Sequence, residues 1–128
     1  MQKKQEEFSV LFLQSQQEAG KFSKLSEPLE EKGCWVDMAQ HIEEANRFLD
    51  HRSYDMLLMD ISDISMGECL NLISRLRKLK TNLVVISDHL DSKWYQKAMD
   101  IGVSTIFTKP INPAQLENIV DKYKRVSC

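Results

Sequence analysis

Three polar side chains of different chemistry, Asp60, Ser87 and Lys109, come at or just after the ends of short apolar runs. If these runs are strands of one sheet, a carboxylate, a hydroxyl and an ammonium converge on one point. A carboxylate can act as the nucleophile that forms an acyl phosphate, while the other two groups neutralise its phosphoryl oxygens. The same residues fit equally well an ordinary ion pair between Lys109 and Asp60. The residues alone therefore leave two interpretations open, a phosphoryl-acceptor site and a structural pair at the rim.

Five short apolar runs predict the strands that would position these groups. They cover residues 8–13, 34–38, 54–59, 83–86 and 103–107. Runs this apolar are typical of a sheet that is covered on both faces. Between and after them, apolar residues recur at helical spacing in five stripes: Phe22, Leu25 and Leu29; Ile42, Ala45 and Leu49; Leu72, Ile73, Leu76 and Leu79; Tyr95, Ala98 and Met99; and Leu116, Ile119, Val120 and Tyr123. We expect all five stripes to contact the sheet.

Capping signals support these boundaries. Helix starts are indicated at 15–18 and 112–115, and helix ends at Gly33 and Gly102. One residue conflicts with the pattern, because Pro28 lies inside the expected first helix, where it removes a hydrogen bond. We therefore expect a kink there, or a helix broken around Ser26.

The alternation of strands and helices predicts an α/β fold, a doubly wound five-stranded parallel sheet of (βα)5 form with right-handed crossovers. Binding sites in such sheets lie at the carboxyl ends of the strands, near the topological switch point. The 128 residues fit one domain, 1–128, with its core at about 8–126.

Composition excludes several classes of protein. The net charge is −2, without the clustered basic excess of a nucleic-acid-binding domain. We see no signal peptide and no apolar run near the roughly 20 residues that span a bilayer, so we expect a cytoplasmic protein without membrane contact. Three cysteines without CxxC spacing and three scattered histidines favour neither a disulfide nor a zinc site.

Three segments carry a resemblance to a known family. Residues 54–60 (YDMLLMD) look like the third strand and phosphoacceptor of response-regulator receiver domains, 83–87 (LVVIS) are similar to the fourth strand, and 102–110 (GVSTIFTKP) resemble the fifth strand with its Lys-Pro signature. Each motif alone is weak, but three at the right spacing are strong together. The resemblance covers about residues 8 to 126 in a single register.

The resemblance implies a flavodoxin-like strand order 2-1-3-4-5. It implies that Asp60 is the phosphoacceptor, Ser87 the switch hydroxyl and Lys109 the phosphate-binding lysine. It also implies a cis bond between Lys109 and Pro110.

The chain departs from the family after the first strand. The family normally carries two acidic residues there, one of them a direct Mg²⁺ ligand, whereas this chain has Gln14 and Ser15. Because Mg²⁺ prefers carboxylates among its oxygen ligands, we expect it to be weakly held by Asp60, by the backbone carbonyl of Ser62 and by Ser15 as a replacement for an acid.

Four further positions bear on this chemistry. Glu18 or Asp63 could substitute for the missing acids, although neither is in the natural register. Asp88 follows Ser87 where a small residue is usual, and Ile106 stands in place of the family's switch aromatic. Ile64 occupies a position that is usually proline.

Two functions remain open at this stage. The first is a receiver module of a two-component phosphorelay, not an enzyme, which takes phosphate on Asp60 from a histidine kinase or phosphotransfer protein and shifts a surface equilibrium. A homodimer through the fourth helix, fifth strand and fifth helix is then possible. The alternative is a pseudo-receiver, a protein–protein interaction module that works without phosphorylation. A nucleotide- or flavin-binding enzyme lacks support, since no glycine-rich phosphate loop is present.

Overall fold

The chain alternates strand and helix, as its apolar runs and helical stripes predict. The computed structural model describes residues 8–14, 22–61, 64–79, 81–87, 92–109 and 111–127. Within these ranges the elements are β1 (Ser9–Leu13), α1 (Phe22–Glu31), β2 (Trp35–Ala39), α2 (Ile42–His51), β3 (Met56–Asp60), α3 (Met66–Leu79), β4 (Asn82–Ser87), α4 (Ser92–Ile101), β5 (Thr105–Thr108) and α5 (Pro113–Ser127).

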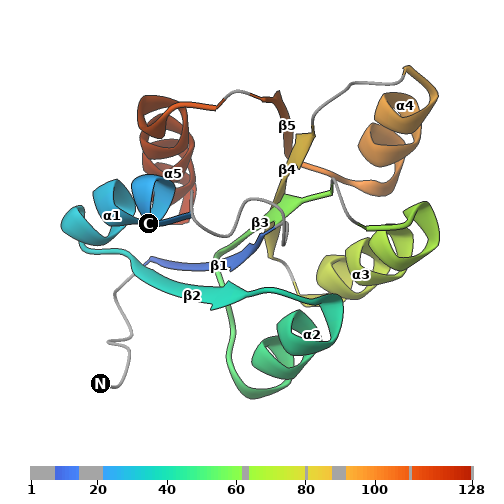
Figure 1. Ribbon diagram of the computed structural model, residues 1–128, viewed down its shortest axis with the longest axis horizontal. Helices are drawn as coiled ribbons and strands as arrows, with labels where there is room; N and C mark the ends of the chain where they lie inside the picture. Colours follow the sequence, from blue (N-terminus) through green and yellow to red (C-terminus); the bar gives the residue numbers. More distant parts are fainter. Residues whose placement is uncertain are drawn as a thin grey trace.

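The strands form one parallel sheet in the order β2-β1-β3-β4-β5. Helices α1 and α5 cover one face, and α2, α3 and α4 cover the other (Figure 1). The doubly wound, flavodoxin-like fold predicted from the sequence is therefore confirmed. The switch in direction lies between β1 and β3, which are neighbours in the centre of the sheet and whose register pairs Leu13 with Met59.

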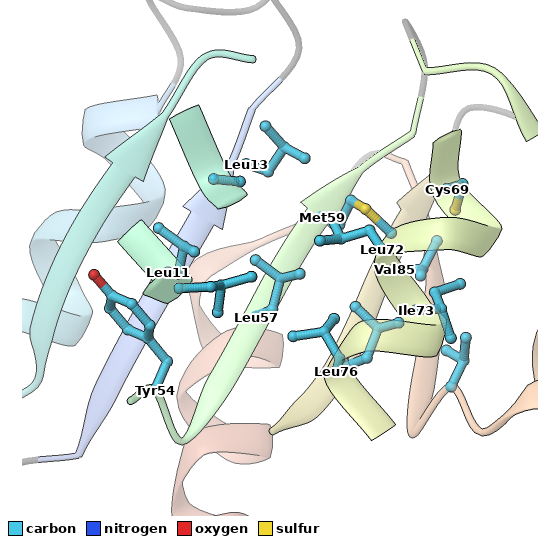
Figure 2. Close-up of a cluster of buried hydrophobic side chains, with 14 of the residues drawn as sticks. Leu11, Leu13, Tyr54, Leu57, Met59, Cys69, Leu72, Ile73, Leu76 and Val85 are labelled. Atoms are coloured by element: carbon cyan, nitrogen blue, oxygen red, sulfur yellow. The ribbon is translucent and has the colours of Figure 1, made fainter. Parts of the chain in front are cut away.

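Alternation along the central strands separates the core into two clusters, one on each face of the sheet. Leu11, Leu57 and Val85 face the α2–α3 side, where they pack with Tyr54 and other buried side chains (Figure 2). The residues one step earlier or later along the same strands pack in the second cluster, beneath α1 and α5. The near-continuous apolar character of these strands follows from this double burial.

The prediction that every helical stripe contacts the sheet is wrong at three residues. Leu79 is 46% exposed, Tyr95 40% and Met99 41%. Leu79 ends α3, and Tyr95 and Met99 lie one turn apart on a flank of α4, whereas Ala98 points at the core. Of the two outcomes expected near Pro28, the break around Ser26 is wrong, because α1 runs continuously through Pro28, while the kink stays a prediction.

The helix boundaries follow the capping signals where the structure describes them. Asn112 Oδ1 accepts from the Gln115 N–H at 3.0 Å, and Gln115 Oε1 accepts from the Asn112 N–H at 2.9 Å. This reciprocal pair starts α5 at Pro113. Gly33 and Gly102 follow α1 and α4 with φ of 90° and 107°, a region that favours glycine. The capping signal at 15–18 lies outside the described residues.

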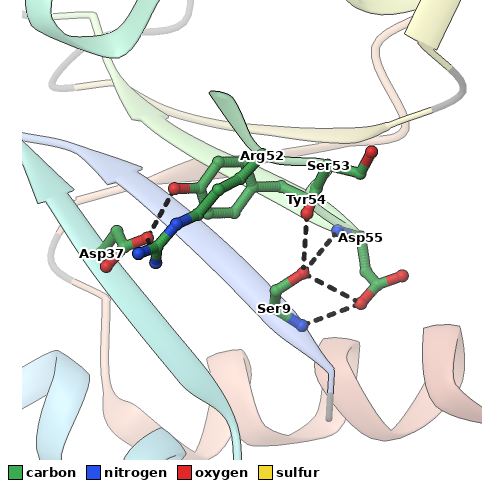
Figure 3. Close-up of polar contacts among 6 residues, drawn as sticks. All are labelled: Ser9, Asp37, Arg52, Ser53, Tyr54 and Asp55. Carbon is green, nitrogen blue, oxygen red and sulfur yellow. Dashed lines mark hydrogen bonds and ion pairs between the residues drawn. The ribbon is translucent and has the colours of Figure 1, made fainter. Parts of the chain in front are cut away.

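Hydrogen bonds tie together the amino ends of the central strands (Figure 3). Asp55 Oδ2 accepts from the backbone N–H of Ser9 at 2.8 Å and from its hydroxyl at 3.2 Å. The Asp55 carbonyl accepts from the Asn82 N–H and from its side-chain amide, both at 3.1 Å. The bonds link β1, β3 and β4 at the edge opposite Asp60.

Beside this edge, a second polar group packs over β2. The Tyr54 hydroxyl donates to Asp37 Oδ2 at 2.5 Å, and Arg52 lies 3.1 Å from the same oxygen (Figure 3). The Arg52 guanidinium also lies 5.1 Å from the centre of the Trp35 ring. Burial, together with the hydrogen bond to the Asp37 carboxylate, raises the pKa of Tyr54 well above its ordinary value.

Two further features concern membranes and thiols. No helix in the described part of the chain is long and apolar enough to cross a bilayer. Cys34 and Cys69 are free and buried. Burial raises the pKa of the Cys69 thiol to about 11.

Candidate functional site

The site at the carboxyl edge is centred on Asp60, the last residue of β3. Its backbone pairs with Ile86 of β4, and the next N–H, that of Ile61, donates to the Ile86 carbonyl at 3.0 Å. The strand therefore holds Asp60 rigidly where the ladder ends. Alternation places the carboxylate on the same face as Leu58, above the α1–α5 side of the core.

Lys109 supplies the charge that this buried carboxylate requires. Its ammonium Nζ lies 2.8 Å from Asp60 Oδ2, and the two side chains are only 14% and 6% exposed. Lys109 follows the short strand β5, and its backbone N–H donates to the Ser87 carbonyl at 2.9 Å. Two interactions thus fix Lys109, one through its side chain and one through its backbone. The expected meeting of Asp60 and Lys109 is present in the structure.

Ser87 lies at the same edge as the last residue of β4, and it is buried. It pairs with Thr108 across the sheet. Because side chains alternate along a strand, that of Ser87 lies on the same face as Val85, the α2–α3 side, whereas Asp60 lies on the opposite face. The side chains of Ser87 and Asp60 therefore leave the carboxyl edge of the sheet on opposite faces.

Gln14 completes the described part of the site. It follows β1, donates its backbone N–H to the Ala39 carbonyl at 3.0 Å and is only 6% exposed. Since Leu13 pairs with Met59, Gln14 lies level with Asp60 on the neighbouring strand. Its side-chain Oε1 is buried and makes no hydrogen bond with any residue that the structure describes.

Several residues predicted to shape the site lie outside the described residues. They are Ser15, Glu18, Ser62, Asp63, Asp88 and Pro110. Two others are described: Ile64 and Ile106 are partly buried and pack against the α2–α3 core cluster. Ile106 thus occupies an apolar position in this cluster, and it has no aromatic ring that could change rotamer as the family's switch residue does.

Sequence reasoning missed two features of this edge. The burial of Gln14 has a signal in the sequence, since the residue directly follows the apolar run that forms β1. The backbone bond from Lys109 to Ser87 has none, because it depends on the register of β4 and β5.

Comparison with known proteins identifies the family. The family model for the response regulator receiver domain matches residues 6–121. The chain belongs to this family. Receiver domains are signalling modules of two-component systems, generally phosphorylated on an aspartate, and they interact with histidine kinases or phosphotransfer proteins.

Solved structures agree with this assignment. A response regulator from Thermotoga maritima is 25% identical, with a TM-score of 0.80 over 93% of this chain and 98% of that one. A two-component response regulator from Clostridium difficile is 24% identical, with a TM-score of 0.80 over 93% and 97%. A CheY-like receiver domain protein from Methanospirillum hungatei is 16% identical, with a TM-score of 0.76 over 93% and 98%, which bears on the fold alone.

Receiver domains generally bind Mg²⁺ at an acidic site, but the described residues of this chain do not fit a resident Mg²⁺. This ion takes octahedral oxygen ligands, usually with one or two carboxylates. The described edge offers the carboxylate of Asp60, which the Lys109 ammonium already engages, and the neutral amide of Gln14. Across the described ranges, no three His, Cys, Asp or Glu side chains gather closely enough to hold a metal ion. The expected contributions of Ser15 and the Ser62 carbonyl stay predictions.

Proposed function

We propose that residues 1–128 form one receiver-like domain of a two-component phosphorelay, which accepts a phosphoryl group on Asp60. The observation that supports this most is the buried ion pair between Asp60 and Lys109. It joins a nucleophilic oxygen to a cation at the carboxyl edge of the sheet, where doubly wound folds bind their ligands. The donor is a histidine kinase or a phosphotransfer protein, as is general for the family.

Each residue has a distinct role in this proposal. One carboxylate oxygen of Asp60 attacks phosphorus, the Lys109 ammonium neutralises a phosphoryl oxygen, and the Ser87 hydroxyl donates to another. Ser87 ends the strand next to Asp60, so its hydroxyl lies at the same edge of the sheet. Because the Lys109 N–H is bonded to the Ser87 carbonyl, the ends of β4 and β5 move together.

The surface that responds is formed by α4, β5 and α5. Tyr95 and Met99 expose an apolar pair on α4, which suits contact with a protein partner, including a second copy of this chain. The proposal involves no nucleic-acid contact by this domain and assigns it no enzymatic activity of its own.

The test is phosphorylation by a small donor. We expect the protein incubated with acetyl phosphate to gain a phosphoryl adduct in its intact mass, and Asp60→Asn to gain none. Asp121→Asn is the matched control, because Asp121 is likewise paired with a lysine, Lys32, at 2.7 Å, but on the exposed surface. An adduct that persists in Asp60→Asn, or its absence from the wild-type protein, contradicts the proposal.

One observation favours the pseudo-receiver as the second candidate. We take Gln14 and Ser15 to replace the family's acidic pair, so the described charges at the edge, Asp60 and Lys109, already balance. A balanced site is stable without any phosphoryl group. If acetyl phosphate gives no adduct while Asp60→Asn still binds the same protein partner as the wild-type protein, the phosphorylation-independent module is the better description.

A further inference from the structure

A buried amide oxygen without a hydrogen-bond partner lies beside the acceptor. Gln14 is 6% exposed, and its Oε1 has no partner among the residues that the structure describes. Folded proteins leave few buried polar atoms unpaired, and each exception requires an explanation such as a ligand. Asn112 Oδ1 and Gln115 Oε1, by contrast, each accept a backbone N–H at the start of α5.

The amide lies on the same face of the sheet as the acceptor carboxylate. Leu13 and Met59 are paired neighbours on β1 and β3 (Figure 2), so the following residues, Gln14 and Asp60, are level with one another. Both alternate with members of the α1–α5 core cluster, Phe12 and Leu58. The Gln14 amide is therefore the neighbouring polar group on β1 that a phosphoryl group on Asp60 would meet on this face of the sheet.

The described charges at this edge balance without a divalent cation. The described residues contribute one negative charge, Asp60, and one positive charge, Lys109, and Gln14 adds none. Conversion of the carboxylate to a doubly charged acyl phosphate changes this balance by a single negative charge. Donors of neutral hydrogen bonds can stabilise such an excess in a water-poor site.

We propose that Gln14 takes the place of a metal ion at Asp60, so that phosphoryl transfer to this chain is independent of Mg²⁺. The side-chain Nε2–H donates to a phosphoryl oxygen. Oε1 makes no hydrogen bond with the described residues, so a half-turn about the last side-chain bond, which exchanges Oε1 for the Nε2 donor, breaks no hydrogen bond at that oxygen. This inference rests on the proposed function of Asp60 as acceptor.

The reaction balances without a metal or a proton. With acetyl phosphate as donor, an Asp60 oxygen forms the new bond to phosphorus, and the bond from phosphorus to the acetyl oxygen breaks. Acetate leaves with the electron pair of that bond. The Lys109 ammonium and the Gln14 amide remain in place and bind phosphoryl oxygens before and after transfer.

Metal binding tests half of the inference without any phosphorylation. Mn²⁺ replaces Mg²⁺ as the probe, because its free concentration can be followed by electron paramagnetic resonance. We expect Mn²⁺ to bind weakly to the wild-type protein. Gln14→Glu, which replaces the amide by a carboxylate of nearly the same shape, should bind it with an affinity at least about tenfold higher. Single groups at metal sites change the affinity by about this factor. Equal and tight binding by both proteins overturns the inference.

The rate of adduct formation tests the other half. We expect the wild-type rate with acetyl phosphate to be the same in EDTA and in MgCl₂, and Gln14→Met, which keeps the length but lacks the amide, to be slower in both. Thermal melts confirm that the variants are folded. A wild-type rate that requires MgCl₂, or a Gln14→Met rate equal to wild type, overturns the inference. Absence of any wild-type adduct instead refutes the proposed function and with it the phosphoryl contact, while the Mn²⁺ result still decides the metal preference.

Discussion

Replacement of Lys109 by methionine should strongly destabilise the fold, because it leaves the Asp60 carboxylate buried without its cation. At the observed 2.8 Å the gross attraction is about 6 kcal/mol for an effective dielectric constant of about 20. Desolvation offsets most of it while the pair is intact, but loss of one partner from a buried pair costs about 3–5 kcal/mol. For a domain of this size that corresponds to a fall in Tm of roughly 10–20 °C.

The assay is thermal and urea unfolding of the wild-type protein and of matched variants. Lys32→Met removes an ion pair of similar length, 2.7 Å, but an exposed one, so its effect should be far smaller. The double variant Asp60→Asn/Lys109→Met should regain much of the stability lost in Lys109→Met, because no unpaired charge remains. If Lys109→Met costs no more than Lys32→Met, the buried pair does not hold this edge together, and the reasoning is refuted.

Three further predictions concern burial elsewhere in the chain. Because burial and Asp37 raise the pKa of Tyr54, its protonated form stabilises the fold below the ordinary tyrosine pKa of about 10, and this stabilisation is lost as pH rises above that value. Urea unfolding at neutral and alkaline pH should show the loss in wild type and a weaker pH dependence in Tyr54→Phe. Cys128→Ser leaves two thiols, Cys34 and Cys69, and burial raises the pKa of both, that of Cys69 to about 11. Ellman's reagent at pH 8 should therefore label this variant slowly when it is native and fast when it is unfolded; rapid native labelling argues against this. Leu57→Ala should cost about 2–5 kcal/mol in urea unfolding, as it opens a cavity in the centre of the sheet, and a loss below 1 kcal/mol is inconsistent with that packing.

The sheet and its central residues could be predicted because local patterns determine them. Apolar runs such as the one before Asp60 form strands that are covered on both faces, and the carboxyl ends of parallel strands meet at one edge. The meeting of Asp60 with Lys109 follows from that topology alone. The capping pair at Asn112 and Gln115 is equally local.

What could not be predicted depends on three-dimensional packing. Tyr95 and Met99 share the helical spacing of core residues, yet both are exposed, whereas Ala98 on the same helix is buried in the core. The helix α1 continues through Pro28 because the loss of one hydrogen bond is offset by tertiary contacts, in which the next residue, Leu29, is fully buried. The face on which the Ser87 side chain lies is set by strand register.

The bonds at the amino edge of the sheet determine how a local event at Asp60 can spread. Sliding β3 past β1 or β4 would break the bonds of Asp55 to Ser9 and Asn82. The strands are thus held in register at their amino ends. A displacement introduced at the carboxyl ends is therefore transmitted between the ends of neighbouring strands rather than along a strand. In hydrogen exchange, the amides of Ser9 and Asn82 should be among the last to exchange, and any change on modification of Asp60 should fade along each strand towards them.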